Sequence, residues 1–176
     1  MRFALPAIVL LATTLAHADP ATAEALFTEG RQLFAAGDSA AACPKFEASN
    51  KADPAVGTQL NLAMCWEKLG KNASAWAMYM QVVNASTSSG RNDRAQLAQQ
   101  RAAALLPTLS KLTITAPAGS SIRVDGVAWS AALTGIPTPV DPGRHTIEAT
   151  AANKPTFHRV VDVPANAATI TVAVAF

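Results

Sequence analysis

Residues 41–66, which read AACPKFEASNKADPAVGTQLNLAMCW, decide the fold of the N-terminal half. Two runs of helical composition flank Asp53-Pro54, a pair typical of a turn between helices. Cys43 lies 11 residues before Pro54, and Cys65 lies 11 residues after it. In an antiparallel helical hairpin, equal distances from the bend put two residues level, here about 16 Å from it. The spacing therefore predicts a helix pair closed by a Cys43–Cys65 disulfide, against the alternative of two separate buried thiols.

The same stretch belongs to a longer helical region, residues 19–106. Glycine and proline breaks divide this region into five helical segments. The chain also matches itself at an interval of about 33 residues, with small residues where helices approach and large ones where they fill a groove. The matched pairs are Gly30 with Ala63, Leu33 with Trp66, Gly37 with Gly70, Ala42 with Ala75, and Phe46 with Tyr79.

This pattern resembles the tetratricopeptide repeat, in which each unit is a pair of antiparallel helices. The resemblance covers two units, residues 23–55 and 56–88, with residues 93–106 as a terminal capping helix. It implies a short helical array with a concave face. The alternative is a plain bundle of five helices.

The hydrophobic period changes from helical to alternating near Thr108. Leu112 and Ile114 alternate with threonines, the C-terminal residues 169–176 do the same, and Asp125-Gly126 is a hairpin turn signal. Residues 107–176 are therefore expected to form about seven short strands in a small antiparallel β-sandwich. The fold class predicted for the whole chain is α+β in two modules, 19–106 and 107–176, joined by a short link in which Leu109 and Leu112 contact the helices.

Three motifs of the β half carry a second resemblance. Val124-Asp125-Gly126 is followed by GIPTP at 135–139 and by DPGRHTI at 141–147. This order of an Asp-Gly turn, a Gly-x-x-Pro loop and a Pro-Gly turn that feeds a strand is similar to the PEGA domain. A signal peptide, tetratricopeptide-like helices and a PEGA-like tail together resemble a family of bacterial envelope proteins.

The first 18 residues have the features of a secretory signal peptide. Arg2 precedes an uncharged apolar run of about 13 residues, and Ala16-His17-Ala18 is a small-x-small cleavage site. The run is short of the roughly 20 residues that a membrane span needs, so an uncleaved anchor is the less favoured alternative. We therefore expect a periplasmic or secreted protein that begins at Asp19. An oxidising compartment also favours the disulfide.

Composition and motifs argue against an enzyme. Lys and Arg number 14 against 12 Asp and Glu, without a basic cluster, so no nucleic-acid partner is expected. The spacing of His145 and His158 fits no metal motif, and a solvated strand-edge histidine is the expected state of both. Asp125 and Asp141 are expected to be turn residues. No catalytic residue, metal or cofactor is predicted.

Binding is the function that remains, and the predicted partner is a protein of the cell envelope. On the repeat frame, six residues are expected on or beside the concave face, where they would suit an extended peptide or a helix. They are Phe27, Arg31, Phe34, Leu60, Met64 and Glu67. The alternative is that the β-sandwich binds cell-wall or surface polysaccharide through Trp129 and Phe157 while the helices act as a spacer.

Overall fold

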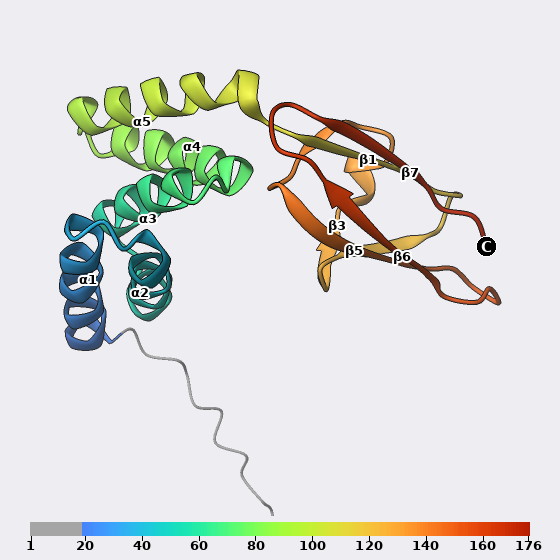
Figure 1. Cartoon of the computed structure of the whole chain (residues 1–176), viewed down its shortest axis with the longest axis horizontal. Helices are drawn as coiled ribbons and strands as arrows, with labels where there is room; N and C mark the ends of the chain where they lie inside the picture. The colour runs from blue at the N-terminus through green and yellow to red at the C-terminus, as the bar shows by residue number, and fades with distance from the viewer. Residues whose placement is uncertain (1–18) are drawn as a thin grey trace, which may run out of the picture.

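The computed structural model describes residues 19–176 as two lobes, one of helices and one of strands (Figure 1). The five helices are α1 (Pro20–Ala35), α2 (Ser39–Ala52), α3 (Val56–Lys68), α4 (Asn72–Ser88) and α5 (Asn92–Leu105). The seven strands are β1 (Lys111–Thr115), β2 (Ser121–Val124), β3 (Val127–Trp129), β4 (Thr138–Pro139), β5 (Gly143–Thr150), β6 (Phe157–Val163) and β7 (Thr169–Ala173). Short 3-10 turns, η1 (Leu106–Thr108) and η2 (Ala131–Leu133), complete the elements. The predicted two-module α+β class is confirmed, and the predicted signal peptide, residues 1–18, lies outside the described residues.

Local side chains begin the first two helices. Asp19 accepts a hydrogen bond from the backbone N–H of Thr22, and Asp38 accepts one from that of Ala41, so each satisfies an N–H that has no partner within its helix. The later helices lack such caps. Lys71, at the N-cap position of α4, makes no side-chain hydrogen bond to the helix. The start of α4 is therefore open to a partner from elsewhere in the chain.

The two helix pairs, α1–α2 and α3–α4, repeat the same close contact. Gly30 and Ala63 are buried at matched positions, and Phe46 and Tyr79, the large residues matched with each other, are fully buried. A Cβ placed on Gly30 would lie 2.9 Å from two ring carbons of Phe46. A glycine at this position therefore lets α1 approach α2 closely enough for the Phe46 ring to fill the space between them.

The predicted disulfide joins Cys43 of α2 to Cys65 of α3, with the two Cα atoms 5.6 Å apart. Both residues are buried in the hydrophobic cluster that α2 and α3 share, which also contains Phe46 and Leu62. Closing a loop of 22 residues stabilises a fold by about 3 kcal/mol in the chain-entropy description. The bond thus links the first helix pair to the second within this shared cluster.

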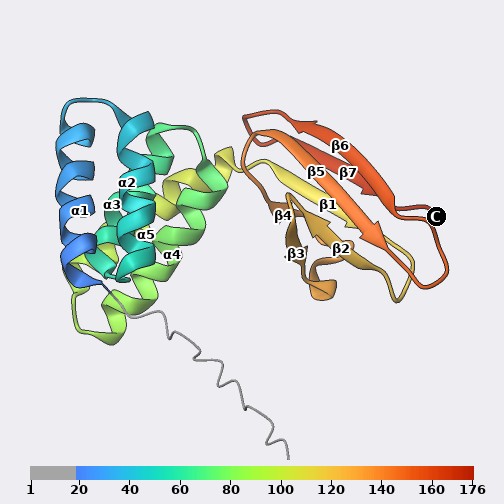
Figure 2. The same ribbon diagram turned by 90° about the horizontal axis from the view of Figure 1, so that it is seen from below.

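The β module consists of two sheets that enclose a core of their own (Figure 2). One sheet has the order β4-β1-β7 and the other has the order β3-β2-β5-β6. The sequence predicts antiparallel pairing throughout, and the pairing of β1 with β7 is an exception, because these two strands run parallel. Alternating hydrophobicity reports which face of a strand is buried and carries no information on strand direction, so sequence patterning could not reveal this pairing.

The two modules meet at a short, structured link. Leu109 is buried in the core of α3, α4 and α5, whereas Leu112 is fully buried in the β core. The prediction that Leu112 contacts the helices is therefore wrong, because its place in β1 turns its side chain between the sheets. Ser110 is buried between these two leucines, and its hydroxyl donates to the carbonyl oxygen of Pro164 at 2.6 Å. The change from one core to the other thus takes place within three residues.

We expect Gly30→Ala to lower the free energy of unfolding by about 1–2 kcal/mol, since the added methyl group must displace Phe46 from a close-packed core. Gly57→Ala is the matched control. A Cβ on Gly57, in α3, would meet no atom within 4 Å, so the same change should stabilise the protein by about 0.5 kcal/mol. Denaturant unfolding of both variants measures the difference. Equal effects at the two glycines would contradict the proposed contact between α1 and α2.

Candidate functional site

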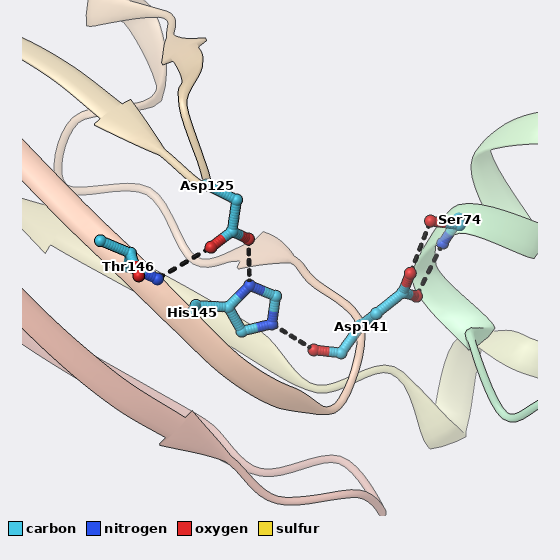
Figure 3. A network of polar contacts seen from close by, with 5 residues as sticks. All are labelled: Ser74, Asp125, Asp141, His145 and Thr146. Carbon is cyan, nitrogen blue, oxygen red and sulfur yellow. Dashed lines mark hydrogen bonds and ion pairs between the residues drawn. The ribbon is translucent and has the colours of Figure 1, made fainter.

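The candidate site lies between the modules, where the open start of α4 faces the loop before β5. Asp141, in that loop, accepts two hydrogen bonds from Ser74 in the first turn of α4 (Figure 3). One carboxylate oxygen takes the backbone N–H of Ser74 at 2.9 Å, and the other takes its hydroxyl at 2.5 Å. Asp141 thus caps α4 from the other module, and its charge also interacts favourably with the positive end of the helix dipole.

His145, near the start of β5, holds the loop that carries Asp141. Its Nδ1 lies 2.6 Å from a carboxylate oxygen of Asp125, and its Nε2 lies 2.8 Å from the backbone carbonyl oxygen of Asp141. Asp125, which follows β2, also accepts the backbone N–H of Thr146 at 2.8 Å. A carbonyl oxygen and a carboxylate can only accept, so both contacts are hydrogen bonds only when both ring nitrogens carry a proton. The two contacts together therefore favour the imidazolium form of His145.

The electrostatics of the network agree with this protonation state. Burial of the ring lowers the pKa of His145, but the hydrogen bonds to Asp141 and Asp125 and their negative charges outweigh it, and the net pKa is raised. For Asp125, partial burial raises the pKa, while the Thr146 N–H and the His145 ring lower it by more, and the net pKa is lowered. An ion pair between His145 and Asp125 is therefore the favoured form at mildly acidic pH.

These residues do not form a catalytic dyad. The Ser74 hydroxyl donates to Asp141 and not to His145, and neither ring nitrogen of His145 is left to accept a proton from it. A general base needs a nitrogen lone pair directed at the group that it deprotonates. What the arrangement can do is fix the two modules against each other.

A cavity of about 370 Å³ opens beside the network. The first turns of α4 form one wall, and the edge strand β3 with the loop before β5 forms the other. Small side chains of α4, Ala73 and Ala77, leave the space open, and Trp129 of β3 lines the opposite wall. Among the described residues, the indole nitrogen of Trp129 is buried and has no hydrogen-bond partner. The cavity thus has a mainly apolar lining around the Asp141–His145 contacts.

Two of the six predicted partner-binding residues lie together. Phe27 and Arg31 line a second open cavity, of about 300 Å³, on the outer face of α1. The guanidinium carbon of Arg31 lies 5.9 Å from the centre of the Phe27 ring, within reach of a cation–π contact. The Phe27 ring also packs against Phe46 with a centroid distance of 5.9 Å. Its inner side thus supports the helix pair while its outer side faces the cavity.

The other four lie apart from this cavity. Phe34 packs against the core of the first helix pair, and Leu60 and Met64 pack against the core of α3, α4 and α5. Glu67 accepts a hydrogen bond from the Tyr79 hydroxyl at 2.7 Å and forms an ion pair with Arg101. All four side chains are half-buried.

Glu67 also alters the titration of its partner. Burial of Tyr79 raises the pKa of its phenol, and the hydrogen bond to Glu67 raises it further. The phenol therefore stays a hydrogen-bond donor, and its contact with Glu67 joins α4 to α3.

The two aromatic residues predicted for polysaccharide binding are half-buried. Trp129 and Phe157 both pack against the β core. The prediction that both histidines are solvated is correct for His158, which is exposed, and wrong for His145, whose side chain is 13% exposed. Burial between two acidic neighbours, which lie 4 and 20 positions away in the sequence, gives His145 its different environment.

Comparisons with known proteins give no family. No protein-family model and no curated protein matches this chain. The tetratricopeptide and PEGA resemblances therefore rest on the residues quoted above and stay predictions. Within residues 19–176, none of the helices has the length and apolar character of a membrane span. The same residues contain no group of three or more His, Cys, Asp and Glu side chains placed to hold a metal ion.

Sequence reasoning missed Ser74 and the capping role of Asp141. Patterning shows Asp141 only as part of a turn, because the residue it binds is 67 positions earlier in the chain. The one available signal is the absence of a capping side chain before α4, where Lys71 stands at the N-cap position.

We expect the network to make its full contribution to stability at mildly acidic pH. The pKa of His145 is raised in the fold, so its contribution is complete below about 6.5, the value of a free histidine, and is lost as pH rises through the folded value. The pKa of Asp125 is lowered, so its contribution is complete above about 3.9 and is lost as pH falls through the folded value. Raising the pH should therefore lower the free energy of unfolding by about 1–2 kcal/mol.

Denaturant unfolding between pH 5 and pH 9 measures this loss, with two histidine variants for comparison. His145→Gln should flatten the profile, because glutamine does not titrate. His158→Gln, at an exposed site on β6, should keep the profile of the unmodified protein. If His145→Gln and the unmodified protein gave parallel profiles, the imidazolium bridge would be wrong.

Proposed function

We propose that this chain is an exported, non-enzymatic binding protein of the cell envelope whose helical module engages a protein partner through the cavity on α1. The observation that carries the proposal is the pairing of Phe27 with Arg31 at that cavity. Arg31 is exposed and has no ion-pair partner among residues 19–176. An apolar side chain of the partner would pack on Phe27, and a neighbouring carboxylate would pair with Arg31.

Two features support export. The Cys43–Cys65 disulfide is of the kind that persists in oxidising compartments, and residues 1–18 have the order of a secretory signal peptide. Both features support a periplasmic or secreted location. The resemblance to bacterial envelope proteins points the same way.

The contacts between the two modules favour the role of a scaffold over that of a catalyst. The polar groups that converge there satisfy one another, because Asp141 binds Ser74 and both nitrogens of His145 are engaged. In a scaffold, hydrogen bonds of this kind hold the partner-binding helices and the β module in one relative orientation. The β module would then set where the captured partner lies.

Polysaccharide binding through the β module is the less favoured function. Stacking on a sugar needs an open aromatic face, whereas Trp129 and Phe157 both lie half-buried against the β core. Trp129 does line the cavity between α4 and β3, so a sugar ring could reach only the part of the indole that faces this cavity.

Capture of envelope proteins on the immobilised chain tests the proposed function. Arg31→Glu should reduce the retention of a specific partner at least about tenfold, because the partner carboxylate would meet a like charge. Arg91→Glu, the same change at an exposed position outside the cavity, should leave retention unchanged. Equal retention by both variants would rule out the α1 cavity. Binding of cell-wall polysaccharide that Trp129→Ala abolishes would favour the alternative.

A further inference from the structure

The β6 strand forms a long free edge of the β module. It is the last strand of the β3-β2-β5-β6 sheet and pairs only with β5 among the described strands. It has 7 residues, whereas the other edge strands, β3, β4 and β7, have 3, 2 and 5. Figure 2 shows β6 at the border of the β module. An unpaired edge of this length presents a row of backbone donors and acceptors to any strand that can align with it.

The outward face of β6 carries a basic and an acidic side chain on either side of an apolar centre. His158, Val160 and Asp162 alternate along this face, and all three are exposed. Val160, the middle residue of the strand, is 37% exposed. In the register with β5, His158 lies opposite Glu148 and Asp162 lies opposite Arg144. Each ionisable residue of this face thus has a group of opposite character beside it on the paired strand.

The same three residues are complementary to a second copy of themselves. If two β6 strands pair antiparallel about a two-fold axis with Val160 opposite Val160 of the second copy, His158 of each copy lies opposite Asp162 of the other. In each of the two outer cross-strand rows, Arg144 and Asp162 are then followed by His158 and Glu148 of the second copy. Neighbouring groups in the row are complementary, as cross-strand pairs in stable sheets are.

Other registers lose this match. A shift of β6 by two residues in one direction places Arg159 opposite Arg159 of the second copy, which sets like charges directly against each other. The opposite shift places Asp162 against Val160 and leaves His158 beyond the end of the paired strands. In the register centred on Val160, Arg159 lies opposite Val161 instead. The side chains therefore select one alignment, which is closed by its two-fold symmetry and does not continue into a fibre.

We propose that β6 is a self-association edge at which two copies of this chain pair antiparallel about Val160, joining their four-stranded sheets into one continuous sheet.

A single introduced cysteine tests this alignment directly. The two natural cysteines are bonded to each other, so Val160→Cys adds the one free thiol in the chain. Directly opposed residues of an antiparallel pair have Cα atoms about 4.5–5.5 Å apart, within the range of a disulfide. Mild oxidation should therefore give a covalent dimer. Thr171→Cys is the matched control, because Thr171 is exposed on β7, the edge of the other sheet. It should form no covalent dimer under the same conditions.

Sedimentation of the unmodified protein and of Val160→Lys supplies a measurement without crosslinking. The unmodified protein should show a concentration-dependent dimer. Val160→Lys should weaken that dimer by at least about tenfold, because two ammonium groups would face each other at the axis. A protein that stays monomeric at all concentrations would overturn the proposal, as would a dimer that Val160→Lys leaves intact. Equal crosslinking of Thr171→Cys would overturn it as well.

Discussion

The carboxylate of Asp141 at the start of α4 joins two modules that otherwise have separate cores. Without it, the backbone N–H of Ser74 would lose its partner in the first turn of a helix whose own N-cap residue, Lys71, supplies none. Such a cap contributes about 1 kcal/mol, and the helix dipole adds a few tenths to that when the cap is charged. The contribution to stability is small, but the contact acts directly between the helices and the β module. The chain link between them has its own contacts, in η1 and at Ser110.

The position of Asp141 depends in turn on His145. A protonated imidazole between the Asp125 carboxylate and the Asp141 carbonyl oxygen ties the hairpin turn after β2 to the loop before β5. The β module thereby presents a fixed carboxylate to the helices, whose own integrity rests on the Cys43–Cys65 bond and on the close approach of α1 to α2 at Gly30. In the proposed binding function, these contacts fix the position of the α1 cavity relative to the sheet edge at β6.

Features encoded within a short stretch could be predicted from the sequence. Cys43 and Cys65 are equidistant from one turn, and the Asp125-Gly126 turn is set by positive φ angles of 51° and 76° at its two residues. Relations between distant segments could not be predicted. The parallel pairing of β1 with β7 leaves no mark on hydrophobic alternation, and Ser74 with Asp141 are ordinary polar residues until the fold brings them together. Of the six residues predicted to bind a partner, Phe27 and Arg31 share a cavity, and a pattern of repeats does not reveal which residues do so.

Residual dipolar couplings measured by NMR test most directly whether Asp141 holds the two modules in one orientation. In the unmodified protein, a single alignment tensor should fit the amide couplings of the helices and of the strands together. In Asp141→Ala, the start of α4 loses its external cap, and the two modules should require separate tensors while each keeps its internal couplings. Separate tensors in the unmodified protein, or one shared tensor in Asp141→Ala, would contradict the account.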